Sequence, residues 1–258
     1  MPRRIKLPLT LIATLSFTPL ALPAQTTSRT PVLVELFTSE GCSSCPPADA
    51  LLLRLGHQPI PSADIIILGE HVDYWDQLGW HDRFSSHQFT QRQNQYRVRF
   101  HLESDYTPQM IVDGVTEFVG NDSSRATHAV TLAARQPKIP LVLTPPVTTN
   151  HALSATVSLP ASAADQALAN ANADLYAALI DSLDTTIVRS GENGGRTLQH
   201  AGVVRSLLRI GSLRDLVPAP IPVHLTLPAD AASTPQRIVV FAQSPGQGPI
   251  LAAVSASN

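Results

Sequence analysis

The alternation of apolar and polar residues predicts two kinds of structure along the chain. Up to about residue 139, short β-branched runs alternate with segments in which apolar residues recur every three or four positions, which predicts strands alternating with helices. Beyond residue 140 the composition shifts to Ala, Ser, Thr and Pro, and short segments alternate with period two. We therefore expect an α/β domain with a mixed sheet flanked by helices over residues 25–139, followed by a mainly β, sandwich-like domain over residues 140–258.

The α/β part is predicted to run strand, helix, strand, helical insertion, hairpin and helix. Its strands are expected at residues 31–37, 65–68, 109–112 and 116–119. Its helices are expected over residues 48–55 with Gly56 as the cap, from Ser85 or Ser86 to Phe100, and from Ser123 or Ser124 to about residue 134. The insertion spans about residues 71–106, with Phe84, Phe89 and Tyr96 as its expected core contacts. Asp113-Gly114 is the expected hairpin turn.

The second part shows six segments typical of strands, and no internal repeat. They lie at residues 153–159, 174–180, 203–210, 223–227, 237–242 and 250–254. The Ala-rich stretch 161–173 favours helix by propensity but has no clear apolar face, so both a loop and a short helix stay open.

The N-terminus has the pattern of a signal peptide. Arg3, Arg4 and Lys6 precede an apolar run from Leu7 to Leu22, and Ala24 follows in a small-residue context. The run is short for a bilayer span, contains Pro8 and Pro19 and is followed by Pro23, which favours cleavage over anchoring. We expect residues 1–24 to be removed and the mature protein to be periplasmic or secreted, by the general or the twin-arginine route.

Charge and composition limit the classes of partner that this chain is expected to bind. Hydrophobic residues make up 43% of the chain, charged residues 15%, and the formal net charge is −2. This balance predicts a globular protein without the basic surface that nucleic acid or an anionic membrane attracts. No later segment is apolar for long enough to span a bilayer. We expect protein thiols or disulfides of the cell envelope as partners, and no cofactor.

The chain has two cysteines, so any internal disulfide joins Cys42 and Cys45. A loop of four residues stabilises by only about 2 kcal/mol, against roughly 3 kcal/mol for a loop of fifteen. Such a pair is a weak staple, and redox chemistry is favoured over metal binding and over an inert bridge.

A helix start beside the pair is expected to lower the thiol pKa, because unpaired backbone N–H groups favour a thiolate. Cys42 is predicted to be the accessible attacking thiolate and Cys45 the less exposed resolving thiol. Glu40 opposes the thiolate by its charge. Pro46 and Pro47 favour a helix that either begins later than Cys42 or is kinked there, and a later start would weaken the effect of the helix dipole on the thiol.

The order strand, CxxC, helix and a later Thr-Pro opening a strand resembles the thioredoxin superfamily. The segments 34–49 (VELFTSEGCSSCPPAD), 71–76 (HVDYWD), 106–110 (YTPQM), 191–196 (GENGGR) and 203–205 (VVR) are similar to a family of exported bacterial thioredoxin-like proteins of unknown function. This resemblance implies a thioredoxin-like fold, and a cis Pro108 that faces the cysteines with Thr107 beside it. The chain lacks the Trp before the first Cys, and the Gly-Pro between the two, of classical thioredoxins.

The predicted activity is that of a thiol-disulfide oxidoreductase or redox carrier, with the direction left open. The alternative is a Cu(I)-binding or copper-delivery protein of thioredoxin fold that uses Cys42, Cys45 and His71. Such proteins typically space their cysteines by three residues.

Glu192 and Arg196 are expected in a solvated loop. Five acidic and aromatic residues of the insertion either form a partner-binding rim or pack the insertion down: Asp73, Trp75, Asp76, Trp80 and Asp82.

Overall fold

The computed structural model describes residues 1, 29–230 and 235–257. The predicted signal peptide, Met1 apart, lies outside the described residues. None of the helices in the described ranges is long and apolar enough to cross a membrane.

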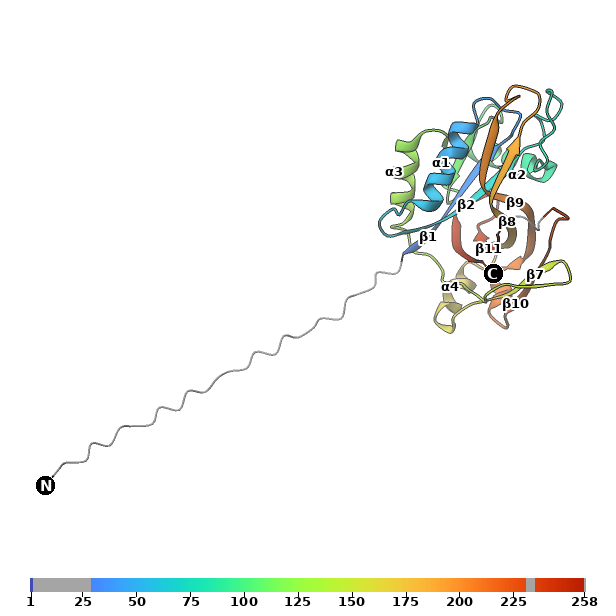
Figure 1. Cartoon of the computed structure of the whole chain (residues 1–258). Coiled ribbons are helices and arrows are strands. Elements are labelled where there is room, and N and C mark those ends of the chain that lie inside the picture. The colour runs from blue at the N-terminus through green and yellow to red at the C-terminus, as the bar shows by residue number, and fades with distance from the viewer. Residues whose placement is uncertain (2–28, 231–234, 258) are drawn as a thin grey trace.

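The first part of the chain alternates strands and helices as predicted. Its elements are β1 (Thr30–Thr38), α1 (Pro46–His57), β2 (Ala63–His71), α2 (His87–Phe100), β3 (Gln109–Val112), β4 (Thr116–Val119) and α3 (Ser123–Ala133). β1 is covered on both faces, so it is an almost continuous apolar run. α1 and α3 lie on one side of β1, and α2 lies on the other (Figure 1). Val34 and Leu36 pack with residues of α1 and α3, whereas Leu33 and Phe37 pack with Phe89 and Tyr96 of α2.

The second part is mainly β. It contains β5 (Val142–Leu143), β6 (Val147–Thr149), β7 (Ala152–Ser158), the 3-10 helix η1 (Ala161–Ala163), α4 (Ala164–Ala169), β8 (Asp174–Ile187), β9 (Thr197–Ser212), the 3-10 helix η2 (Leu213–Leu216), β10 (Ile221–Thr226), β11 (Gln236–Gln243) and β12 (Ile250–Ser257). The Ala-rich stretch therefore forms η1 and the short α4, and β8 and β9 extend beyond the predicted strands.

One mixed sheet of eight strands joins the two parts, in the order β12-β11-β8-β9-β2-β1-β3-β4. The junction is the parallel pair Gly69↔Val203 between β2 and β9. It needs glycine beside it: Gly202 has a φ of 64°, and a Cβ there would lie 2.7 Å from the carbonyl oxygen of Ile67. The boundary predicted between residues 139 and 140 falls between α3 and β5, and the large sheet crosses it.

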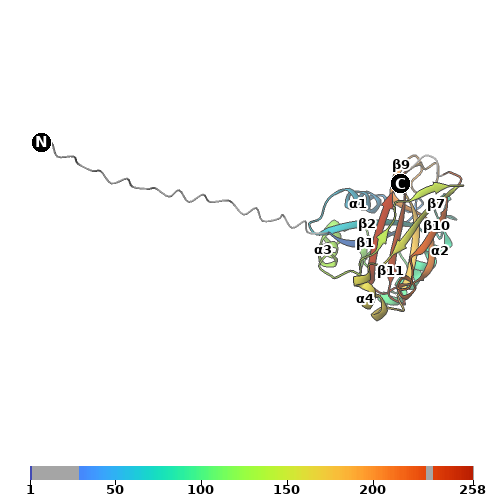
Figure 2. The ribbon, with the colours of Figure 1, turned by 90° about the horizontal axis from the view of Figure 1, so that it is seen from below.

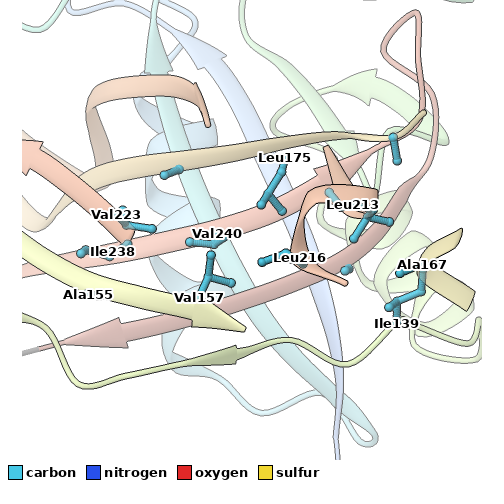
Figure 3. Packing of buried hydrophobic residues seen from close by; sticks show 14 of the residues in the cluster. Ile139, Ala155, Val157, Ala167, Leu175, Leu213, Leu216, Val223, Ile238 and Val240 are labelled. Atoms are coloured by element: carbon cyan, nitrogen blue, oxygen red, sulfur yellow. The ribbon is translucent and has the colours of Figure 1, made fainter. Parts of the chain in front are cut away.

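A small sheet of order β10-β7-β5, with β6 beside β7, packs over one face of the large sheet (Figure 2). Alternate residues of β7 are buried, as the period-two pattern predicts. Val157 and Val223 of the small sheet meet Ile238 and Val240 of β11 in the core between the sheets (Figure 3).

Several predicted details of the first part are confirmed and two are wrong. Asp113 and Gly114 make the hairpin turn with φ values of 53° and 65°, and Ser86 caps α2. Gly56 does not end α1, which continues to His57 because the chain turns extended only at the following residue. The cap of α3 is Asp122, not a serine, because its carboxylate accepts the free N–H of the first turn.

Candidate functional site

Cys42 and Cys45 form a disulfide in the loop between β1 and α1, with their Cα atoms 5.4 Å apart. α1 begins at Pro46, after both cysteines, and Cys45 is its N-cap residue. Pro46 and Pro47 occupy first-turn positions, where a backbone N–H has no partner within the helix. The helix N-terminus therefore lies at Cys45 and not at Cys42, whose thiol was predicted to have its pKa lowered by the helix.

Neither cysteine is accessible: both are 0% exposed, although Ser43 and Ser44 between them are exposed. The prediction of an accessible Cys42 is therefore wrong for this state. The hydroxyl of Ser44 lies 3.4 Å from Sγ of Cys42.

A distant turn between β8 and β9, residues 188–196, bonds to the backbone of the cysteine loop. Nδ2 of Asn193 donates to the carbonyl oxygens of Glu40 and Cys42, both at 2.9 Å. The carboxylate of Glu192 accepts the backbone N–H of Ser43 at 3.1 Å. Glu192 and Arg196 are exposed as expected, but Asn193 is fully buried, so this is not simply a solvated loop.

Thr107 and Pro108 precede β3, and the peptide bond between them is cis, as the resemblance implies. Pro108 is buried and Thr107 half-buried. A Cβ on Gly120 would lie 3.2 Å from the Cβ atoms of both Ala48 and Pro108, so Pro108 lies beside the first turn of α1. The indole N–H of Trp75 donates to the hydroxyl of Thr107 at 2.8 Å.

His71 belongs to a buried hydrogen-bonded group. Its Nδ1 lies 2.6 Å from Oδ2 of Asp82, which also accepts the backbone N–H of Glu40 at 2.8 Å. Burial raises the pKa of Asp82, but His71 and the backbone donors of Glu40 and Phe84 outweigh it and lower the pKa to about 2. Within the part of the chain that the structure describes, no three His, Cys, Asp or Glu side chains are grouped so as to hold a metal ion. His71 is therefore not grouped with Cys42 and Cys45 as a ligand set.

A second buried histidine, His200 of β9, lies between two carboxylates of the cysteine region. Its Nε2 is 3.5 Å from Oε1 of Glu40 and its Nδ1 is 3.7 Å from Oδ1 of Asp49. Burial lowers the pKa of His200, but Asp49 and Glu40 raise it to about 10. His200 is thus an imidazolium at neutral pH, and its ring lies 4.8 Å from that of His71.

The aromatic and acidic residues of the insertion make contacts within the insertion and with the cysteine loop. Trp80 is half-buried and donates its indole N–H to Oε2 of Glu40 at 2.7 Å, and Asp82 is buried. Asp73 and Asp76 are half-buried and bond within the insertion, to Thr90 and Ser85. The packing that was predicted as one alternative is therefore present, and a partner-binding rim at these residues stays a prediction.

A family model described as a protein of unknown function, DUF1223, matches residues 33–243. The chain belongs to the DUF1223 family. Among solved structures, a structural-genomics protein of Agrobacterium tumefaciens has a TM-score of 0.63 and 23% identity, over 87% of this chain and 93% of that one. HBP35 of Porphyromonas gingivalis has a TM-score of 0.57 and 15% identity, over 89% of this chain and 76% of that one. At these identities the likeness concerns the fold alone. No curated protein matches this chain.

Sequence reasoning missed three buried polar residues at the site of this DUF1223 chain: Asp49, Asn193 and His200. Asp49 carried a signal, because it interrupts the apolar face of α1 four residues after Cys45, where both share one side of the helix. Asn193 stands among glycines and His200 in a strand of mixed residues, and neither pattern shows a partner 150 positions away.

Proposed function

We propose that this chain is an extracytoplasmic thiol-disulfide oxidoreductase or redox carrier, acting through the Cys42–Cys45 pair. The observation that carries the proposal is the position of the only two cysteines of the sequence, which are bonded to each other directly before α1. A bridge across so short a loop contributes little as a staple, about 2 kcal/mol in the chain-entropy model. A role in which this disulfide is formed and broken explains the pair better than a stabilising role does.

The exchange runs through a mixed disulfide. In the reduced protein, the thiolate of Cys42 attacks a substrate disulfide, forms a Cys42–substrate bond and releases a substrate thiolate, which takes up a proton. Cys45 then loses its proton and attacks the sulfur of Cys42, which closes the internal disulfide and releases the second substrate thiol. Two electrons pass from the protein to the substrate, and the reverse sequence oxidises a substrate dithiol. The reduction potential sets the direction.

We extend the proposal to the fold and the location. A thioredoxin-like arrangement of residues 25–139 is supported by the order β1, α1, β2, α2, β3, β4, α3 and by helices on both faces of the strands. A sandwich-like arrangement of residues 140–258 is supported by the core between the two sheets. The signal pattern of residues 1–24 supports export to a compartment where disulfides persist, with envelope protein thiols or disulfides as partners.

Equilibration with glutathione buffers, followed by alkylation of free thiols, tests the proposal. We expect a reduction potential above about −300 mV, the value below which structural disulfides typically lie. Cys45→Ser is expected to accumulate mixed disulfides with envelope proteins through Cys42, and the matched variant Cys42→Ser to accumulate far fewer. A pair that stays oxidised below this potential, with no trapped partner, would overturn the proposal.

A further inference from the structure

The turn of residues 188–196 holds the backbone of the cysteine loop, and the exchange reaction does not account for it. Two side chains of the turn are fully buried: the apolar Val188, and the polar Asn193, whose Nδ2 donates to the carbonyl oxygens of Glu40 and Cys42. The residues around it, from position 189 to 192 and from 194 to 197, are exposed. One polar side chain therefore fixes this turn from its inner face.

The backbone hydrogen bonds of the turn close within the turn itself. The N–H of Val188 donates to the carbonyl of Arg196, and that of Gly195 to the carbonyl of Val188, both at 2.9 Å. The N–H of Arg196 donates to Asn193 at 3.1 Å. Movement of the turn about Val188, which is buried at its base, therefore keeps these hydrogen bonds and breaks those to its surroundings.

The bonds to the surroundings are few and come from side chains. Besides Asn193, Glu192 accepts the N–H of Ser43, and the hydroxyl of Ser190 donates to the carbonyl of Gly79 at 2.6 Å. Glu192 and Ser190 are exposed, where water replaces such bonds readily. Gly191 and Gly195 have φ values of 71° and 83°, so glycines with left-handed backbone lie on both sides of Asn193.

We propose that residues 188–196 form a movable cover over the Cys42–Cys45 pair, with Asn193 as its latch, and that sulfur exchange occurs when the cover is lifted. The inference rests on the proposed function and names the regulation of the same site. Both sulfurs are inaccessible with the cover in place. Lifting it frees the carbonyls of Glu40 and Cys42 and the N–H of Ser43, groups with which an extended substrate backbone pairs.

The test is the rate at which dithiothreitol reduces the oxidised full-length mature protein, followed by alkylation and mass spectrometry. We expect Asn193→Ala to be reduced at least ten times faster than the wild type, because the closed state loses both latch bonds. Ser190→Ala, which removes the hydrogen bond from an exposed residue to Gly79, is also expected to accelerate reduction, but by a smaller factor. Arg189→Ala, on the exposed side of the same turn, is the matched control and is expected to react at the wild-type rate.

General destabilisation is controlled with Val223→Ala, which opens the remote core between the two sheets. Reduction of this variant at the wild-type rate, beside a fast Asn193→Ala, supports the cover. Wild-type rates in both Asn193→Ala and Ser190→Ala overturn it, as does equal acceleration by Val223→Ala. The reductant needs no physiological substrate. Failure of Cys45→Ser to trap partners therefore counts against the proposed function alone, and unchanged reduction rates count against the cover alone.

Discussion

Replacing His200 with glutamine removes the positive charge that lies between the carboxylates of Glu40 and Asp49. In the wild type these carboxylates raise the pKa of His200 from 6.5 to about 10, against the effect of burial. Between these two values the folded protein holds one proton more than the unfolded chain, so the free energy of unfolding falls by about 1.4 kcal/mol per pH unit as the pH rises. Over the whole interval the loss is on the order of 5 kcal/mol.

The variant His200→Gln is expected to be less stable than the wild type by about 3–5 kcal/mol at pH 6, because it leaves two buried carboxylates without their partner. The difference is expected to shrink as the pH approaches 10, where the wild type has lost the same interaction. The neighbouring ring of His71, and Asp82 hydrogen-bonded to it, are present in both proteins. Urea unfolding at pH 6, 8 and 10 measures this difference.

His57→Gln is the matched control, since His57 is an exposed histidine at the end of α1, and its stability is expected to follow the wild type at every pH. The His200 ring is also expected to titrate near pH 10 in NMR spectra. A titration near 6.5, or a stability gap between His200→Gln and the wild type that does not change with pH, would contradict this role of His200.

Three further changes have defined outcomes. Asp82→Asn is expected to lower the free energy of unfolding by about 2 kcal/mol at neutral pH, because the pKa of Asp82 is about 2 in the folded protein and 3.8 in the unfolded chain. This stabilisation is present above pH 3.8 and is lost as the pH falls through 2, which acid unfolding measures. Burial and Glu35 hold the pKa of Glu70 well above 4.5 despite Arg92, so the stability of the wild type falls as the pH rises above 4.5. The stability of Glu70→Gln is therefore expected to rise relative to the wild type between pH 5 and 8, and equal slopes of melting temperature against pH would contradict this. Gly202→Ala is expected to destabilise by more than about 2 kcal/mol, because it adds a backbone clash to a left-handed φ, whereas Gly246→Ala, with a φ of 67° and open space around it, is expected to cost only about 1 kcal/mol in thermal unfolding.

The local elements were readable from the sequence because their signals are local. The spacing of Ala48, Leu51 and Leu52 predicts α1, and Asp113-Gly114 predicts the hairpin turn, since each depends on residues a few positions apart. The candidate pair was also readable, because two cysteines allow one internal bond. Pro46 and Pro47 left a later helix start and a kink open, and the structure has the later start.

The surroundings of the pair depend on contacts between distant parts of the chain. Cys42 was predicted to be accessible, and it is buried beside a turn that lies 150 positions away in the chain. The charge on His200 likewise depends on β9 crossing next to β2, where Gly202 allows close approach. Most helices and strands were readable from the residues alone because short-range hydrogen bonding and hydrophobic periodicity set them, and the count of two cysteines allows one internal bond. The burial and the electrostatics of the site depend on the register of strands distant in sequence, which no local pattern specifies.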